Sequence, residues 1–193
     1  MKVLVVVDMQ NDFITGSLGN PEAKAIVPKV KKKIEEAVKN GDLIVYTRDT
    51  HFENYLDTRE GKKLPVKHCI CYSKGWRIPD ELLPPSDYEN YNILDKFTFG
   101  SSELPVLLHE DGVALSCNEI ELIGLMTDIC VVSNALLLKA AFYEGMEISV
   151  DASCCAGSTY KNHEAALKVI KACQINIKND LEYNPVVFDD DFM

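Results

Sequence analysis

The apolar run VLVVV at residues 3–7 constrains the fold of this chain more than any other feature. An unbroken apolar run is typical of a strand that is buried on both faces, as strands of parallel sheets are. Asp8 follows the run immediately. A carboxylate in this place indicates either that the strand has reached the surface or that a functional site lies at its end.

Strand-like and helix-like segments alternate about five times along the chain. The pattern predicts further strands at residues 43–46, 92–95, 119–125, 147–151 and 175–177, and helices at residues 21–40, 103–109, 129–144 and 160–172. This alternation predicts an α/β fold with three α/β/α layers around a mostly parallel central sheet, a Rossmann-like arrangement. Residues 50–92 contain four prolines and are expected to form a long irregular connection. We expect one domain over residues 1–180 and a solvated acidic tail over residues 181–193.

The composition narrows the classes of partner. The chain has 193 residues and a formal net charge of −10, so it repels phosphate backbones and is not expected to bind nucleic acid. No apolar stretch approaches the roughly 18 residues of a membrane span, and no signal peptide is recognised. We therefore expect a cytoplasmic protein with a small-molecule ligand. In such a reducing setting the seven cysteines are interpreted mostly as core residues.

Chemically reactive residues stand where the predicted strands end. These residues are Asp8 after the first strand, Asp49 and His51 after the second, Lys96 after the third, and Cys130 after the strand at 119–125. Because ligands of parallel sheets bind beyond the carboxyl ends of the strands, the pattern predicts one site on this edge.

Cys130 is the candidate nucleophile of that site. The expected helix starts near Asp128 or Ile129, which places Cys130 in its first turn, where free N–H groups favour a thiolate and can hold an oxyanion. Its alternative interpretation is a small buried packing residue. Asp8 is the candidate base, because burial at a strand end raises a carboxyl pKa. Lys96 either orients Asp8 or is an ordinary solvated lysine.

A second candidate cluster consists of Asp49, His51 and His68. One carboxylate and two imidazoles suit a catalytic metal that keeps coordination positions open for water, although isolated D-x-H pairs are common. The remaining histidines, His109 and His163, are interpreted as surface or capping residues.

Four segments in order, VVVDMQNDF, DKFTFGSS, GLMTDICVV and DAS, resemble motifs of the isochorismatase-like cysteine hydrolase superfamily, and within it the nicotinamidase (pyrazinamidase) branch. The resemblance covers about residues 2–177. It implies that Asp8, Lys96 and Cys130 form a catalytic triad. It also implies a cis peptide bond between Leu125 and Met126, next to an oxyanion hole formed by the N–H groups of Met126 and Cys130.

The nicotinamidase branch also implies a divalent metal, first of all zinc, with iron or manganese as alternatives. Asp49, His51 and His68 match its ligands. Glu60 and Asp57 are the candidates for a fourth ligand, and either is alternatively a solvated charge of the loop. Phe13 matches an aromatic residue of the substrate pocket. Leu64 departs from the branch, which usually has a tryptophan before the corresponding proline.

The resemblance therefore implies a homo-oligomeric enzyme that hydrolyses a non-peptide amide, with nicotinamide as the expected substrate and nicotinate and ammonia as products. A metal-independent isochorismatase-like or carbamoyl-amide hydrolase of the same fold is the alternative. The seven cysteines leave a remote third interpretation, a non-catalytic binding protein or a thiol-redox protein.

Overall fold

A six-stranded parallel sheet forms the centre of the protein. The computed structural model describes residues 1–110, 112, 117–142 and 145–180, so the predicted acidic tail at residues 181–193 lies outside the described residues. The strands are β1 (Val3–Val7), β2 (Leu43–Asp49), β3 (Tyr91–Lys96), β4 (Glu119–Leu125), β5 (Glu147–Ala156) and β6 (Asn176–Lys178). They are ordered β3-β2-β1-β4-β5-β6, and each neighbouring pair is parallel. The predicted sheet is thus confirmed, with β1 in its interior.

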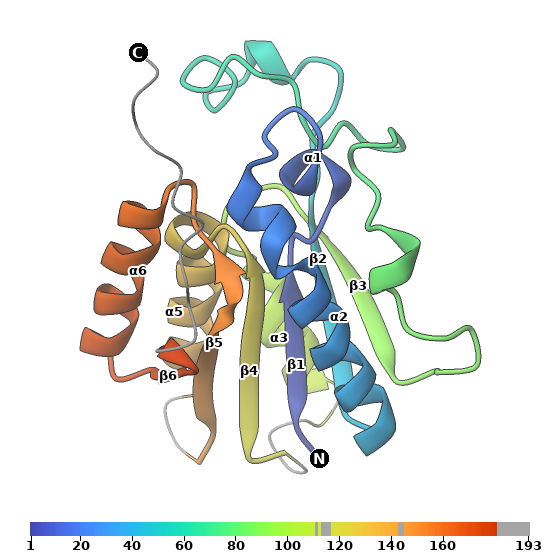
Figure 1. The fold of residues 1–193 in the computed structure, drawn as a ribbon, viewed down its shortest axis with the longest axis vertical. Helices are drawn as coiled ribbons and strands as arrows, with labels where there is room; N and C mark the ends of the chain where they lie inside the picture. The colour runs from blue at the N-terminus through green and yellow to red at the C-terminus, as the bar shows by residue number, and fades with distance from the viewer. Residues whose placement is uncertain (111, 113–116, 143–144, 181–193) are drawn as a thin grey trace.

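Helices cover both faces of this sheet (Figure 1). Helix α2 (Pro21–Asn40) lies on one face, and α3 (Glu103–Glu110), α5 (Val132–Ala141) and α6 (Tyr160–Ala172) lie on the other. Successive side chains of β1 point to opposite faces, so Val3, Val5 and Val7 enter the core under α3, α5 and α6, while Leu4 and Val6 pack under α2. The valine run is therefore buried from both sides, and the three-layer prediction is confirmed.

Local signals explain the long helix on the first face. The side chain of Asn20 accepts a hydrogen bond from the N–H of Ala23 at 2.7 Å, which caps the start of α2. Ile26, Val30 and Ile34 form the buried stripe of the helix. Gly41, with a φ of 70°, ends the helix in the left-handed conformation that glycine adopts readily.

Three predicted elements differ from the structure. Strand β2 is longer than predicted and continues to Asp49. Strand β5 continues to Ala156, and its residues 152–156 are buried although their side chains are small or polar. The predicted helix at 129–144 begins with a π-helical turn, Thr127–Val131, followed by α5; residues 143–144 lie outside the described part of the chain.

The first part of the long connection between β2 and β3 lies over the carboxyl edge of the sheet (teal in Figure 1), and the rest descends beside β3 to the start of that strand (green). The connection contains only two short 3₁₀ segments, Tyr55–Asp57 and Asp80–Leu82. The short helix α1 (Asn11–Ile14) fastens it, since the Asn11 side chain donates hydrogen bonds to the carbonyls of Lys74 and Arg77. In the described part of the chain, no helix combines the length and apolar character required to cross a membrane.

Candidate active site

Asp8, Lys96 and Cys130 meet at the carboxyl edge of the sheet, and all three side chains are buried. They come from the end of β1, the end of β3 and the π-helical turn after β4. Lys96 Nζ lies 2.6 Å from Asp8 Oδ2 and 3.4 Å from Cys130 Sγ. The topology thus brings together a carboxylate, an ammonium and a thiol that are far apart in the sequence.

The two oxygens of Asp8 have different surroundings. Oδ1 accepts a hydrogen bond from the Thr47 hydroxyl at 2.7 Å. Oδ2 lies beside the Lys96 ammonium but accepts no well-aligned hydrogen bond from the described residues. Burial raises the pKa of Asp8, and the positive charge of Lys96 opposes this effect. The arrangement leaves Oδ2 able to accept a proton.

The nucleophile candidate is a thiol rather than a preformed thiolate. Burial, together with the negative charge of Asp8, raises the pKa of Cys130 well above its usual value, although Lys96 opposes the shift. This raised pKa runs against the expectation that the helix start favours the thiolate, because the buried sulfur lies close to the negative charge of Asp8. If Cys130 acts as a nucleophile, a base must remove its proton, and Asp8, which contacts the same Lys96 ammonium, is the candidate.

The end of β4 determines where Cys130 lies. Gly124 has a φ of 113°, and a Cβ at this position would lie 2.1 Å from the carbonyl oxygen of Val7, so only glycine fits against β1. The peptide bond between Leu125 and Met126 is cis, as the resemblance implied. The Asn134 side chain then donates a hydrogen bond to the Cys130 carbonyl at 2.8 Å. Sequence reasoning did not identify Asn134, which stands one helical turn after the cysteine.

A second group of side chains converges next to Lys96. It contains one ligand atom each from Asp49, His51, Glu60 and His68, and these atoms all lie within 4.8 Å of one another. Of the two candidates for the fourth ligand, Glu60 belongs to this group, whereas Asp57 is exposed in its 3₁₀ segment.

The geometry of this group fits a metal ion. His51 Nε2 is buried and has no hydrogen-bond partner among the described residues, although Asp49 Oδ2 lies 2.9 Å away. His68 donates its Nδ1 hydrogen to the Val66 carbonyl at 2.8 Å, which leaves Nε2 free to coordinate. Two imidazoles and two carboxylates are ligands that zinc and other first-row divalent ions accept.

Asp49 belongs to both groups. Its Oδ2 faces the two histidines, and its Oδ1 lies 3.3 Å from Lys96 Nζ. Burial raises the pKa of Asp49, but the neighbouring histidines and Lys96 outweigh this effect and lower it. Asp49 therefore remains ionised, as a metal ligand must.

Three supporting residues were not predicted as such. The Gln10 amide accepts a hydrogen bond from the Asp49 N–H at 2.7 Å and donates one to the Asp49 carbonyl at 2.9 Å. Asp12 Oδ2 accepts a hydrogen bond from the N–H of Cys69, next to His68, at 2.8 Å. The Tyr55 ring packs against both ligand histidines. The polar residues after the valine run thus orient the second strand end and the His68 loop.

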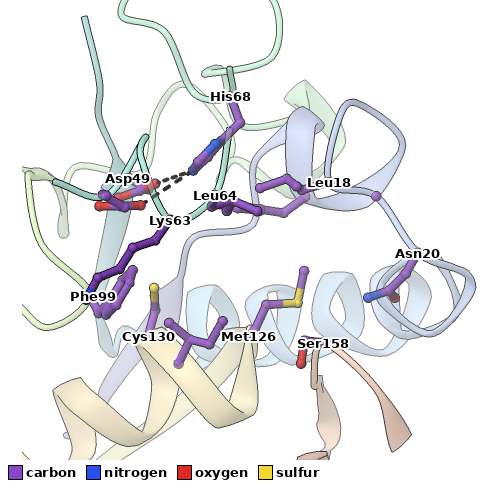
Figure 2. A pocket seen from close by; sticks show the side chains of 14 residues that line it. Leu18, Asn20, Asp49, Lys63, Leu64, His68, Phe99, Met126, Cys130 and Ser158 are labelled. Atoms are coloured by element: carbon purple, nitrogen blue, oxygen red, sulfur yellow. Dashed lines mark ion pairs between the residues drawn. The ribbon is translucent and has the colours of Figure 1, made fainter. Parts of the chain in front are cut away.

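A cavity of about 500 Å³ opens between the two groups. Its lining includes Asp49, His68 and Cys130. Its apolar part includes Phe13, which was predicted to line the substrate pocket, Leu64, which stands where the nicotinamidase branch usually has tryptophan, and Met126. Figure 2 shows Cys130 directed into this space from below and His68 from above. A molecule in this cavity would therefore contact both the thiol and the carboxylate–histidine group.

Two other predictions fail in the structure. His163 is fully buried, and its Nδ1 lies 2.7 Å from the Thr127 hydroxyl, so it is not a surface or capping histidine. It lies on the buried stripe of α6 with Ala166, Leu167 and Ile170, a spacing that the sequence contained. Cys173, one of the seven cysteines that were interpreted mostly as core residues, is exposed. His109 is exposed as expected and stacks on Phe142.

Known proteins share both this sequence pattern and this fold. The isochorismatase domain family matches residues 2–178. A nicotinamidase of Saccharomyces cerevisiae is 30% identical over 123 residues, which span 50% of this chain but only 56% of that protein.

Two solved structures are similar over nearly their whole length. A pyrazinamidase of Pyrococcus horikoshii in complex with zinc is 31% identical, with a TM-score of 0.74 over 91% of this chain and 97% of the other. An N-carbamoylsarcosine amidase of Thermoplasma acidophilum is 28% identical, with a TM-score of 0.75 over 95% and 99%.

Proposed function

The chain belongs to the isochorismatase family, and from this membership we propose that it is a metal-dependent cysteine amidohydrolase that converts nicotinamide and water to nicotinate and ammonia. One observation carries the proposal: Cys130, from the Asp8–Lys96–Cys130 group, lines the same cavity as Asp49, Glu60 and His68 of the second group. The similarity to a nicotinamidase and to a pyrazinamidase that binds zinc supports it.

The first half of the proposed reaction acylates the enzyme. Asp8 Oδ2 takes the proton of the Cys130 thiol, and the sulfur attacks the amide carbon. The resulting oxyanion is held by the backbone N–H groups of Met126 and Cys130. When the tetrahedral intermediate collapses, the C–N bond breaks, the proton passes from Asp8 to the amine, and ammonia leaves a thioester on Cys130.

The second half regenerates the enzyme. Asp8, now ionised, takes a proton from a water molecule, whose oxygen attacks the thioester carbon. The C–S bond breaks, the proton passes from Asp8 to the Cys130 sulfur, and the acid product loses its own proton to solvent and leaves as nicotinate. Lys96 stays cationic throughout, because Asp8 and Asp49 raise its pKa despite the burial that lowers it. Its charge keeps Asp8 ionised between the proton transfers.

Asp49, His51, Glu60 and His68 are the residues that would hold the metal. A bound metal supplies a Lewis acid for the ring nitrogen of the substrate. Phe13, whose ring lies 5.7 Å from that of His68, then forms a wall beside the ring. These side chains orient the substrate so that its carboxamide reaches Cys130.

A carbamoyl-amide hydrolase is the second candidate function. The similarity to the N-carbamoylsarcosine amidase favours it, since that structure matches this fold as well as the pyrazinamidase does. Both candidates use the same cysteine chemistry, and they differ in substrate and in the need for a metal.

Ammonia release from nicotinamide and from N-carbamoylsarcosine distinguishes the two candidates. We expect the zinc-loaded wild-type protein to hydrolyse nicotinamide, and Cys130→Ala to lose at least about a thousandfold in rate. Cys173→Ala, which alters an exposed cysteine, serves as the matched control and should retain full activity. Hydrolysis of N-carbamoylsarcosine alone would replace the nicotinamidase proposal, and equal rates for Cys130→Ala and the wild type would refute both.

A further inference from the structure

The cavity extends well beyond the reactive groups (Figure 2). Cys130, Asp49, His68 and Phe99 lie at one end, which we call the reaction end. Leu18, Asn20 and Ser158 lie at the opposite end, which we call the far end. Between the two ends, Leu64 lies above the cavity and Met126 below it in this view.

The volume is large for a single-ring substrate. Cavities of roughly 300–1,000 Å³ typically enclose drug-sized ligands, and this one measures about 500 Å³. A nicotinamide whose carboxamide carbon contacts Cys130 and whose ring lies beside Phe13 and His68 is confined to the reaction end. The far end then remains open to a further part of the substrate.

The polar side chains at the far end already have partners. Asn20 Oδ1 accepts the hydrogen bond from Ala23, and its Nδ2 donates to the Gly157 carbonyl at 3.2 Å. The Ser158 hydroxyl donates to Asp128 Oδ2 at 2.6 Å. Beside these groups the lining away from Asp49, Glu60, Lys63 and His68 is formed by Gly19 and by apolar side chains, among them Leu18, Leu64, Met126 and Ile129. The far end therefore favours an apolar group over a charged or strongly polar one.

We propose that the site takes aromatic primary carboxamides that carry an apolar substituent on the ring, and that Leu64 determines this specificity. The proposal rests on the amidohydrolase function above and names its substrate class. Leu64 is the determinant because it borders the passage between the two ends. A larger side chain there closes the far end without altering Asp8, Lys96, Cys130 or the metal ligands.

The test compares nicotinamide with 5-propylnicotinamide and quinoline-3-carboxamide, measured as ammonia release by the zinc-loaded enzyme. The wild type should hydrolyse at least one substituted amide with a kcat/KM about tenfold or more above that of nicotinamide. Leu64→Trp should reduce this ratio of kcat/KM values by about tenfold or more, while it continues to hydrolyse nicotinamide. Leu56→Trp is the matched control, since Leu56 is exposed in the same connection and does not line the cavity.

Each outcome separates the inference from the function it rests on. Nicotinamide hydrolysis with no preference for either substituted amide overturns the inference and leaves the proposed function intact. If the ratio of kcat/KM for the substituted amide to kcat/KM for nicotinamide is the same in Leu64→Trp and Leu56→Trp, Leu64 does not determine the specificity. Ammonia release from none of the three amides overturns the proposed function itself. If Leu64→Trp does not fold, Leu18→Trp provides the same closure from the neighbouring wall.

Discussion

Lys96 connects the two halves of the site at the scale of single residues. Its Nζ lies 2.6 Å from Asp8 Oδ2, 3.3 Å from Asp49 Oδ1 and 3.4 Å from Cys130 Sγ. A buried ammonium of this kind is stable only with paired carboxylates, and here it has two. One cation therefore opposes the protonation of both the proposed base and a proposed metal ligand.

Asp8→Asn tests the proposed base directly. The amide has nearly the shape of the carboxylate but cannot take the thiol proton, so we expect kcat/KM for nicotinamide to fall by about 10²–10⁴-fold. Lys96 keeps Asp49 as a partner, so the variant should still fold, which a thermal unfolding curve will show. Asp57→Asn is the control, because Asp57 is an exposed acidic residue, and it should match the wild type in activity and in thermal unfolding. An Asp8→Asn enzyme with more than a tenth of wild-type activity would mean that another group accepts the proton.

At the scale of elements, the turn that carries Cys130 is held by the start of α6. The Thr127 hydroxyl lies 2.7 Å from His163 Nδ1. Asp128 accepts hydrogen bonds from the N–H and the hydroxyl of Ser158 at 2.8 Å and 2.6 Å. Gly157 lies between Asp128 and His163, and a Cβ at this position would approach each of them within 3.0 Å. The β5–α6 junction thus holds the turn that carries the proposed nucleophile.

His163 gives this junction a pH dependence. Burial lowers the pKa of His163 to about 4, although the charges of Asp128 and Asp180 oppose the shift. In the unfolded chain the pKa of a histidine is about 6.5, so between these two pH values the unfolded state binds a proton that the folded state does not. The free energy of unfolding should therefore fall by up to about 3 kcal/mol as the pH decreases from about 6.5 to about 4.

Urea unfolding at several pH values measures this contribution. His163→Gln removes the titrating group and should show a shallower loss of stability between pH 6.5 and 4 than the wild type. His109→Gln, a change at an exposed histidine, should keep the wild-type slope. Identical slopes in wild type and His163→Gln would show that other groups dominate the acid sensitivity.

At the scale of the whole molecule, the sequence predicted the strands and helices that follow a local pattern, and the reactive residues that stand at the strand ends. The valine run and the four-residue spacing of α2 determine their elements through burial, and the parallel order then brings Asp8, Lys96 and Cys130 to one edge. The sequence could not choose between Glu60 and Asp57. The Tyr55 ring and the path of the connection decide that choice, and both depend on tertiary contacts.

The same limit explains the errors. His163 and the extra residues of β5 are polar or small, so their types indicate the surface although their positions are buried. The supporting roles of Gln10 and Asp12 depend on partners at Asp49 and Cys69 that only the folded connection supplies. Composition and spacing identify reactive residues more readily than the residues that orient them.

The metal-ligand group joins the long connection to the sheet, so metal binding should stabilise the whole fold. An ion that binds only the folded state at a hundred times its dissociation constant adds about 2.7 kcal/mol, which for a chain of this size raises Tm by roughly 5–10 °C. We expect this rise when zinc is returned to the chelator-treated protein and not when it is added to the double variant His51→Ala and His68→Ala. His109→Ala should respond as the wild type does, because it is exposed and lies outside the group. An equal rise in the double variant would place the stabilising ion elsewhere and remove the metal from the proposed site.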